Sequence, residues 1–378
     1  MANPPALLRT PFYEYHNQQN ARMVDFAGWE MPLLYKDFGI IPEHEHTRAK
    51  ASIFDVSHMG RMRISGDEAT TFLNRLVTRN LTKAQVGQSV YSLMCRADGG
   101  ILDDLILSRF DHHWLIVCNA GNRATVLGTL QTAVAQTKGL KVKIQDETLS
   151  TAMVAIQGPK AMELLDELLP DPASDLKRYH FSVQRYMMMI QFTVFRSGYT
   201  GEDGVEIILG NSAAGMAMKF LASDSGPHAV LRPAGLGARD TLRMEAGMPL
   251  YGHELTVETD PLSAGLNWAV DLEKDFVGVE ALRRIAAAGG PKRKLVGLFV
   301  EGPKSARQGM ELRAGGGGAV VGIVTSGTTS PTLKRGIAMA YVDTQLSSVG
   351  TKLEVDLRGS AVPAEVTKLP FFSRTRKT

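Results

Sequence analysis

The sequence predicts an α+β fold in which two related units with antiparallel sheets are followed by a small C-terminal β-barrel or sandwich. Residues 61–145 and 146–285 share one order of elements, since in each a strand and a helix precede a run of strands and a further helix, as in βαββαβ units. A linker rich in alanine, glycine and basic residues, Ala286–Lys294, follows them. Beyond it, short β-prone segments alternate with glycine and proline turns, which is typical of a small barrel or sandwich.

Length and composition fit an enzyme of several domains. The chain has 378 residues, of which 44% are hydrophobic and 21% charged, and its formal net charge is +3. At about 100–200 residues a domain, this length corresponds to two or three domains. Nucleic-acid binding is disfavoured, because no long basic block with interleaved aromatic residues occurs.

The cysteine and apolar patterns bear on location. Cys95 and Cys118 are the only cysteines and form no CxxC pair, which indicates a reducing compartment and disfavours a disulfide framework or a cysteine metal site. The first residues lack the features of a signal peptide, and the longest apolar run, Tyr186–Phe195, is too short to cross a bilayer. We therefore expect a cytoplasmic protein without membrane contact. A mitochondrial matrix location is the alternative, although no Arg- and Ser-rich presequence occurs.

The first sixty residues predict two helices and a strand. One helix begins at Pro11, the second runs through Glu43–Lys50, and the strand is Ser52–Gly60; an aromatic segment, Phe26–Trp29, separates the helices. Three histidines occur here: His44, His46 and His58. They are predicted to be surface or core residues and not a metal site, because the first two diverge on a helix and no acidic ligand has suitable spacing.

Residues 61–145 predict a strand, a helix, a three-stranded meander and a second helix. The expected strands are Arg61–Ser65, Tyr91–Arg96, Ile101–Phe110 and Trp114–Cys118, and the expected helices are Asp67–Val77 and Ala120–Gln136. Asp98-Gly99 is a strong hairpin signal within the meander, because both residues tolerate positive φ. Asn119 stands where the last helix needs an N-cap, and capping is its favoured interpretation.

The rest of the chain continues this pattern and then changes to short strands. Residues 146–285 predict strands at Ala152–Gln157, Phe181–Phe195 and Val205–Leu209, and helices after Pro159, at Ala213–Ala222 and at Pro233–Gly247. The C-terminal part predicts strands at Lys294–Val300, Ala319–Ser326, Gly336–Val342, Thr351–Leu357 and Ala361–Lys368.

Two adjacent acids interrupt an apolar strand of the meander. Because successive side chains of a strand point to opposite faces, Asp103 shares a face with Leu105, whereas Asp104 shares the other with Leu102 and Ile106. The two acids are therefore not expected to act as a carboxylate pair. One is expected against an apolar wall, where a carboxylate is costly unless it binds a cationic or hydrogen-bonding group. A capped acid at the edge of the strand is the alternative.

A glycine-rich loop and a helix supply further polar candidates. The loop Gly198–Gly204 is not a phosphate loop, since it lacks Gly-Lys-Ser/Thr and opens no helix. Glu206 follows it within a β run and could face solvent on an antiparallel sheet. Arg239 and Arg243 are four residues apart on a predicted helix, so both lie on one face. Such a face can hold a carboxylate, although a solvated surface is commoner.

Five segments spread over the whole chain resemble the glycine cleavage T-protein family, whose members are tetrahydrofolate-dependent aminomethyltransferases. They are Phe54–Gly60, Gly99–Leu105, Gly198–Gly204, Gly237–Asp240 and Ser330–Lys334. The resemblance implies three domains around a central folate channel. A folate-binding α+β domain would comprise residues 1–52 and 146–285, a second, related ferredoxin-like domain residues 53–145, and a C-terminal β-barrel residues 293–378.

The resemblance also implies the site residues and the reaction. Asp104 corresponds to the catalytic aspartate beside the reactive folate nitrogens. The residues implied to bind folate are Met59, Tyr91, Asn119, Tyr199, Glu206 and Arg239. The first two would line the folate path, Tyr199 and Glu206 would hold the pterin, and Arg239 would meet the glutamate tail. The implied partner is the lipoylated H-protein, whose aminomethyl group would yield ammonia and 5,10-methylenetetrahydrofolate.

Two other functions are compatible with parts of the sequence. A tetrahydrofolate-dependent demethylase of a methylated amine or sulfonium compound would need no lipoyl protein. Its flavin-linked relatives carry a dinucleotide-binding domain, and no GxGxxG strand-turn-helix occurs here. A non-enzymatic folate-binding module related to iron–sulfur assembly factors would carry a cysteine motif where this chain has Gly198–Gly204.

Overall fold

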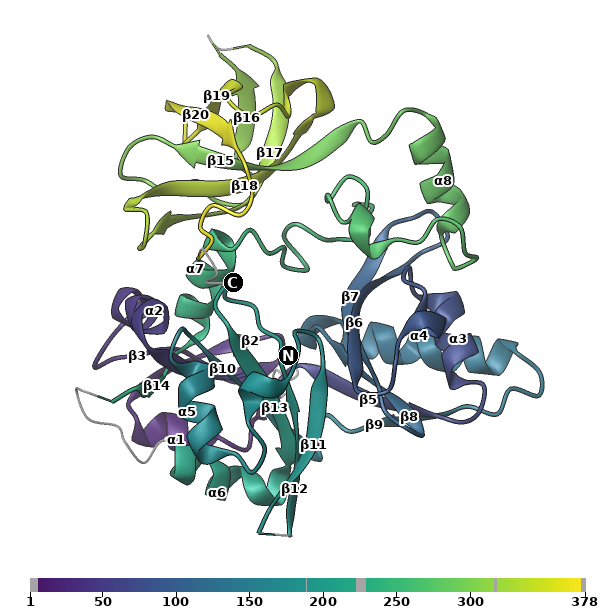
Figure 1. Ribbon diagram of the computed structural model, residues 1–378. Coiled ribbons are helices and arrows are strands. Elements are labelled where there is room, and N and C mark those ends of the chain that lie inside the picture. The colour runs from purple at the N-terminus through teal and green to yellow at the C-terminus, as the bar shows by residue number, and fades with distance from the viewer. Residues whose placement is uncertain (1–5, 188, 222–228, 316–317, 375–378) are drawn as a thin grey trace.

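The computed structural model describes residues 6–187, 189–221, 229–315 and 318–374. Its larger parts are a six-stranded sheet, a five-stranded sheet and a closed C-terminal barrel (Figure 1). The predicted fold class is thereby confirmed, with a barrel in place of the alternative sandwich. The end of the helix expected at Ala213–Ala222 reaches beyond the described residues, as does the end of the expected C-terminal domain at residue 378.

The six-stranded sheet has the order β11-β12-β13-β10-β4-β14. Its strands are β4 (Ala51–Asp55), β10 (Thr151–Gln157), β11 (Phe181–Tyr186), β12 (Ile190–Phe195), β13 (Gly204–Gly210) and β14 (Leu231–Pro233). The helices α1 (Tyr13–Gln18), α2 (Ile40–Ala49), α5 (Ala161–Leu168), α6 (Asn211–Leu221) and α7 (Leu236–Glu245) accompany it. The expected long strand Phe181–Phe195 is in fact the antiparallel pair β11–β12.

The five-stranded sheet has the order β6-β7-β8-β5-β9, and all its pairings are antiparallel. Its strands are β5 (Gly60–Ser65), β6 (Gln88–Cys95), β7 (Ile101–Arg109), β8 (His113–Cys118) and β9 (Lys143–Asp146), with helices α3 (Ala69–Leu76) and α4 (Arg123–Gln136). The Asp98-Gly99 hairpin signal is confirmed, since Gly99 has φ +90° between β6 and β7.

The barrel closes in the order β15-β18-β17-β16-β19-β20. Its strands are β15 (Arg293–Val300), β16 (Glu311–Ala314), β17 (Val320–Ser330), β18 (Arg335–Asp343), β19 (Lys352–Asp356) and β20 (Ala361–Thr367). The sequence prediction missed β16, because it is only four residues long and glycines follow it.

The two sheets face each other through a shared apolar layer. Helices cover the outer face of each, over Val205 and Ile207 in one and over Leu105 and Leu107 in the other. The remaining faces meet in one cluster that includes Ile208 and partly buried Ile106. Because strand side chains alternate, Glu206 and Asp104 lie on these inner faces, at the seam between the sheets.

The two helices predicted in the first sixty residues are present as α1 and α2, but the prediction missed a hairpin between them and joined two strands into one. After the short helix α1, the chain forms the hairpin β2 (Ala21–Phe26) and β3 (Trp29–Tyr35), to which β1 (Leu8–Arg9) adds in parallel. Ala27 and Gly28 form its turn with positive φ, so the aromatic segment is a hairpin corner. The expected strand Ser52–Gly60 is divided: β4 belongs to one sheet, β5 to the other, and the turn between them carries Met59.

The division into three domains stays a prediction, and two of its expected limits fall inside helices or strands. The boundary between residues 52 and 53 falls inside β4, which pairs with β10 and β14 of the six-stranded sheet. The stretch after α7 packs on the other sheet, where Leu255 and Leu266 share a cluster with Leu93 and Ile101. Helix α8 (Val279–Ala287) ends this stretch, two residues beyond the expected limit of 285.

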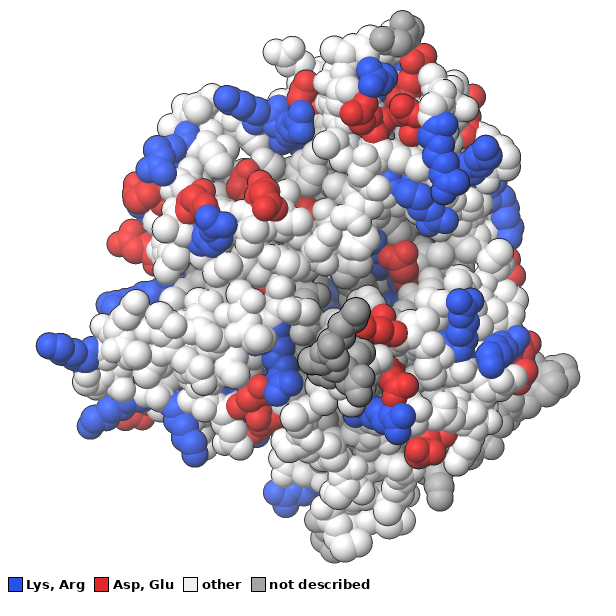
Figure 2. Space-filling view, turned by 180° about the vertical axis from the view of Figure 1, so that it is seen from behind, with Lys and Arg blue, Asp and Glu red and all other residues white. Residues whose placement is uncertain are grey.

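The surface carries charges of both signs. On the face in Figure 2, basic and acidic residues are interspersed, in keeping with the small formal net charge of +3. Within the described part of the chain, no helix is long and apolar enough to cross a membrane.

Candidate active site

Asp104 lies on the inner face of β7 and is held by two neighbours. Asn119 Nδ2 donates to Asp104 Oδ1 at 2.6 Å, and the Tyr91 hydroxyl on β6 donates to Oδ2 at 3.2 Å. Burial raises the pKa of Asp104, while these two hydrogen bonds oppose the shift. Beside these two side-chain donors, the partly buried carboxylate keeps acceptor capacity for a further partner.

Asp103 lies on the opposite face and is fully buried. It accepts from the backbone N–H and the side chain of Asn119, at 3.0 and 2.8 Å, and from Asn122 Nδ2 at 2.7 Å. Burial, together with the charge of Asp104, raises the pKa of Asp103 to about 7. The two acids face opposite sides of β7, as strand alternation predicts, but the side-chain amide of Asn119 binds both.

The capping prediction for Asn119 was also wrong. A 3₁₀ turn, Ala120–Asn122, follows this residue, and its side chain makes no cap hydrogen bond. It points instead at Asp103 and Asp104 on the neighbouring strand. The predicted alternation along β7 fails at Leu102, which packs on the helix side with Leu105, because the register with β6 shifts beside it.

The six-stranded sheet contributes an aromatic ring and two charges. The Tyr199 hydroxyl donates to the carbonyl of Pro249 at 2.5 Å, and the Arg239 guanidinium of α7 lies 5.0 Å from the ring centroid. Glu206 accepts from the Ser197 hydroxyl at 2.6 Å. Burial lowers the pKa of Arg239, and interaction with Glu206 counteracts this shift. Arg239 Nη1 is buried and has no hydrogen-bond partner among the described residues, so it can donate to a ligand.

Met59 lies at the crossing from one sheet to the other. Its carbonyl accepts from Arg61 Nη1 at 2.6 Å, and its side chain packs in the seam cluster that also contains Ile106. The fully buried Arg61 also holds the carbonyl of Ser57 at 3.0 Å, so this turn is fixed from within.

The three histidines lie in different surroundings. His44 is hydrogen-bonded to Thr241, and His46 to the carbonyl of Val230. Burial lowers the pKa of His58 to about 4, so its imidazole is neutral at pH 7. Among the described residues, no group of three or more His, Cys, Asp or Glu could hold a metal ion.

The residues expected at the site form two groups that face each other across the seam, Asp104 with Tyr91 and Asn119, and Tyr199 with Arg239. Met59, Tyr91, Asp104, Asn119, Tyr199, Glu206 and Arg239 all remain partly exposed, whereas Asp103 is not. Electrostatic interactions connect Tyr199 with both Asp104 and Arg239 across the seam. The site thus offers the carboxylates of Asp104 and Glu206 and the guanidinium of Arg239, beside aromatic rings. Such a set of groups suits a flat ligand that has hydrogen-bond donors and an anionic end.

Trp268 is a site candidate that sequence reasoning missed. Its ring stacks on Tyr91 with centroids 5.1 Å apart and planes at 26°, and the residue is 56% exposed. A large exposed aromatic ring beside Tyr91 extends the apolar wall of the site. No local signal could have shown this, since the stacking joins residues far apart in the chain.

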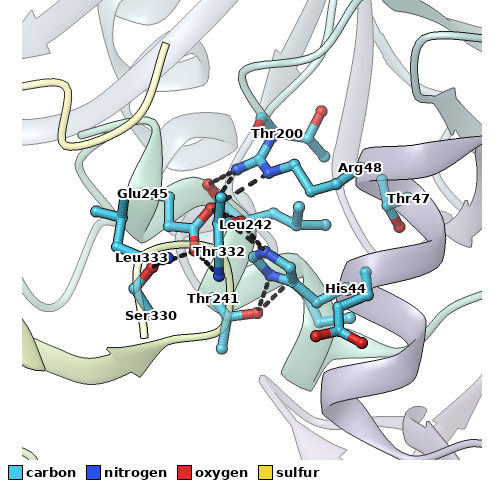
Figure 3. Close-up of polar contacts among 12 residues, drawn as sticks. His44, Thr47, Arg48, Thr200, Thr241, Leu242, Glu245, Ser330, Thr332 and Leu333 are labelled. Carbon is cyan, nitrogen blue, oxygen red and sulfur yellow. Dashed lines mark hydrogen bonds and ion pairs between the residues drawn. The ribbon is translucent and has the colours of Figure 1, made fainter. Parts of the chain in front are cut away.

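Arg243 and the Ser330–Lys334 segment lie in networks of buried polar contacts that hold the fold together. Arg243 is buried and pairs with Glu254 at 2.7 Å and Asp240 at 2.8 Å, so it is not free to clamp a ligand. The Ser330–Lys334 segment meets Glu245 at the end of α7, where Thr332 donates to it at 2.8 Å (Figure 3). The contacts of Glu245 with Ser330 and Thr332 join the barrel to α7, which accompanies the six-stranded sheet.

Comparisons with known proteins agree with this architecture. The chain matches the family model of the GCVT N-terminal domain over residues 12–274 and that of the glycine cleavage T-protein C-terminal barrel domain over residues 293–373. It is 45% identical to an aminomethyltransferase of Rubrobacter xylanophilus, covering 98% of this chain and 95% of the relative. It is 43% identical to an aminomethyltransferase of Saccharopolyspora erythraea, covering 97% of this chain and 98% of the relative.

A solved structure shows the same fold over the full length. The glycine cleavage system aminomethyltransferase T from Bartonella henselae superimposes with a TM-score of 0.89 at 35% identity, covering 97% of this chain and 98% of that one. The family models, the relatives and the shared fold therefore identify a transferase of the aminomethyltransferase class and not the alternative demethylase. The chain belongs to the glycine cleavage T-protein family.

Proposed function

We propose that the seam between the two sheets binds tetrahydrofolate and that Asp104 acts there in the aminomethyltransferase reaction of the glycine cleavage system. The observation that carries this proposal is the Asp104 carboxylate, held by Tyr91 and Asn119 and left with acceptor capacity. The family depends on folate in general. The unpaired, buried Nη1 of Arg239 supports a bound group with acceptor oxygens.

The proposed roles follow from the groups present. Glu206 offers only acceptors to the donor groups of a pterin, and Tyr199 offers its ring. Tyr91, stacked with Trp268, forms an aromatic wall for the rest of the folate. An ionised Asp104 would stabilise cationic character on the transferred methylene group or accept a proton from a folate amine. Holding donor and acceptor together supplies much of the remaining acceleration.

The lipoylated H-protein is the proposed donor of the aminomethyl group. The decisive experiment mixes this protein with aminomethyl-loaded H-protein, with and without tetrahydrofolate, and measures ammonia and 5,10-methylenetetrahydrofolate. We expect release of ammonia that tetrahydrofolate stimulates, with the folate product in equal amount. Binding of tetrahydrofolate without any release would refute the proposed reaction.

The cytoplasm is the proposed location. Cys95 and Cys118 are both buried and unpaired, which fits a reducing compartment. Fractionation of the native host should place the protein with soluble cytoplasmic enzymes, and its recovery from an oxidising compartment would contradict the proposal.

Trp268→Ala should raise the KM for tetrahydrofolate by about 5- to 50-fold and change kcat little, because it removes stacking area on Tyr91 without touching Asp104. Steady-state kinetics at saturating H-protein would measure both constants. Trp268→Phe serves as the control, because it keeps an aromatic ring beside Tyr91 and should retain most of the affinity. An unchanged KM in Trp268→Ala would exclude the aromatic wall.

Turnover should fall on acidification at a pH above the ordinary aspartate range. The reason is that Asp104 must be ionised, and burial raises its pKa. Asp103→Asn removes a neighbouring negative charge, which makes ionisation of Asp104 easier, so the acid limb should move to lower pH. The measurement is kcat from about pH 5 to 9 at saturating substrates. Turnover that stays constant to the acidic end in the unaltered protein would contradict an ionised Asp104.

A further inference from the structure

The loop Ser197–Gly204, which carries Tyr199, is held by a residue of α2. Arg48 Nη1 donates to the carbonyl of Thr200 at 2.8 Å and to Glu202 Oε1 at 2.9 Å. The side chain of Glu202 has no exposed surface. A buried carboxylate is stable only when cations or hydrogen-bond donors surround it, so the position of Glu202 depends on its partners.

A second cation reaches Glu202 from the far end of the chain. Arg374 Nε donates to Glu202 Oε2 at 2.7 Å, and its Nη2 donates to Oε1 at 3.1 Å. This is a two-pronged contact of the kind that guanidinium and carboxylate form best. Arg374 also donates to the carbonyl of Arg48 at 2.5 Å. The two arginines thus enclose one carboxylate of the loop.

The segment that carries Arg374 is anchored on both sides of the domain contact. The Phe371 ring packs on Phe299 of the barrel, with centroids 6.0 Å apart. The backbone N–H of Phe372 donates to the carbonyl of Glu245 at 2.8 Å, and its ring lies 4.6 Å from the Arg48 guanidinium. Figure 1 shows this segment, in yellow, running from the barrel towards α7. The chain therefore leaves the barrel, and residues 371–374 lie against the elements of the six-stranded sheet.

The two arginines differ in how firmly they are held. Arg48 is 8% exposed and also pairs with Glu245 at 2.9 Å, inside the network of Figure 3. Arg374 is 45% exposed and belongs to the last described residues. Arg48 is therefore the fixed side of the contact, and Arg374 is the side that can be released.

We propose that Arg374 is a positioning residue for the folate site: by holding Glu202 it fixes the Ser197–Gly204 loop and with it the ring of Tyr199. The inference rests on the proposed function, because Tyr199 is assigned there to the pterin. Two events that favour the same loop conformation stabilise each other. Tetrahydrofolate should therefore tighten the docking of Arg374, and docked Arg374 should tighten the binding of tetrahydrofolate.

Kinetics of Arg374→Ala provide the first test. We expect the KM for tetrahydrofolate to rise about 5-fold with kcat within about 2-fold of the unaltered protein, since no reacting group is touched. Arg374→Lys should recover only part of the affinity, because a lysine cannot make the two-pronged contact. Glu45→Gln is the matched control: it breaks the exposed Lys334–Glu45 pair, which also joins the barrel to α2, and should leave KM unchanged.

Limited trypsin digestion provides a readout that does not depend on catalysis. Trypsin can cut after Arg374 only when this side chain has left Glu202. Mass spectrometry of the full-length protein should show cleavage at this bond slowed about 5-fold by saturating tetrahydrofolate, and accelerated in Glu202→Gln. Tetrahydrofolate that binds without slowing cleavage, or an unchanged KM in Arg374→Ala, would overturn the inference alone. A protein that binds no tetrahydrofolate would overturn the proposed function together with it.

Discussion

Asp104→Asn is expected to lower kcat by about 10²- to 10⁴-fold while the dissociation constant of tetrahydrofolate stays within a few-fold. The substitution preserves the size of the side chain and an acceptor oxygen, so the hydrogen bond from Tyr91 can persist. What it removes is the negative charge and the capacity to take a proton. Single-turnover release of ammonia from loaded H-protein measures the first effect, and equilibrium binding of tetrahydrofolate measures the second.

A matched control is available at Asp111, just beyond the C-terminal end of β7. Asp111→Asn makes the identical chemical change in the exposed turn between β7 and β8 and should leave kcat unaltered. Turnover of Asp104→Asn at the level of the unaltered protein would remove the catalytic assignment. Loss of folate binding along with turnover would make Asp104 chiefly a binding residue.

Glu245→Ala is expected to lower the free energy of unfolding by about 3–5 kcal/mol, the cost of breaking a buried ion pair. Glu245 is fully buried at the end of α7, where it pairs with Arg48 at 2.9 Å, lies 3.3 Å from His44 Nε2 and accepts from Ser330 and Thr332 (Figure 3). Its removal leaves the buried Arg48 guanidinium with one carboxylate fewer. Urea unfolding followed by tryptophan fluorescence would measure the change.

The same residue predicts a pH dependence of stability. Burial acts to raise the pKa of Glu245, but hydrogen bonds from His44, Ser330 and Thr332 outweigh it and lower the pKa to about 2. A depressed pKa stabilises the folded protein above the unfolded value of 4.5 and ceases to do so as the pH falls towards 2. Glu245→Ala should lack this part of the acid destabilisation. Glu365→Ala, which breaks an exposed pair with Lys352, should unfold like the unaltered protein.

Local sequence patterns predicted most of the strands and helices, and they predicted the face of β7 on which Asp104 lies. The hairpin at Asp98-Gly99 follows from turn residues that accept positive φ, and the placement of Asp104 away from Leu105 follows from strand alternation. Which acid would serve the site did not follow from alternation. The resemblance to a family selected Asp104, and the catalytic assignment itself still awaits the experiment described above.

The misses share a physical cause, because each depends on contacts between distant segments. Asn119 had a good local use as a cap, but two carboxylates on the adjacent strand bind its amide more favourably. Leu102 changed faces because of a register shift that strand length cannot reveal. Trp268 meets Tyr91 only after the chain has returned to the five-stranded sheet.

The order of strands along the chain also sets the order in which the two sheets can be completed on the ribosome. All strands of the five-stranded sheet, with Asp104, lie within residues 60–146. The strands of the other sheet are far apart in the sequence. Strand β4 can pair only after β10, which begins at Thr151, and β14, which begins at Leu231, have been synthesised. Because N-terminal parts generally fold first during synthesis, the sheet with the reactive acid can close before Tyr199 and Glu206 have been translated. In the nascent chain, the strand that carries Asp104 can therefore be folded before the Ser197–Gly204 loop and β13 exist.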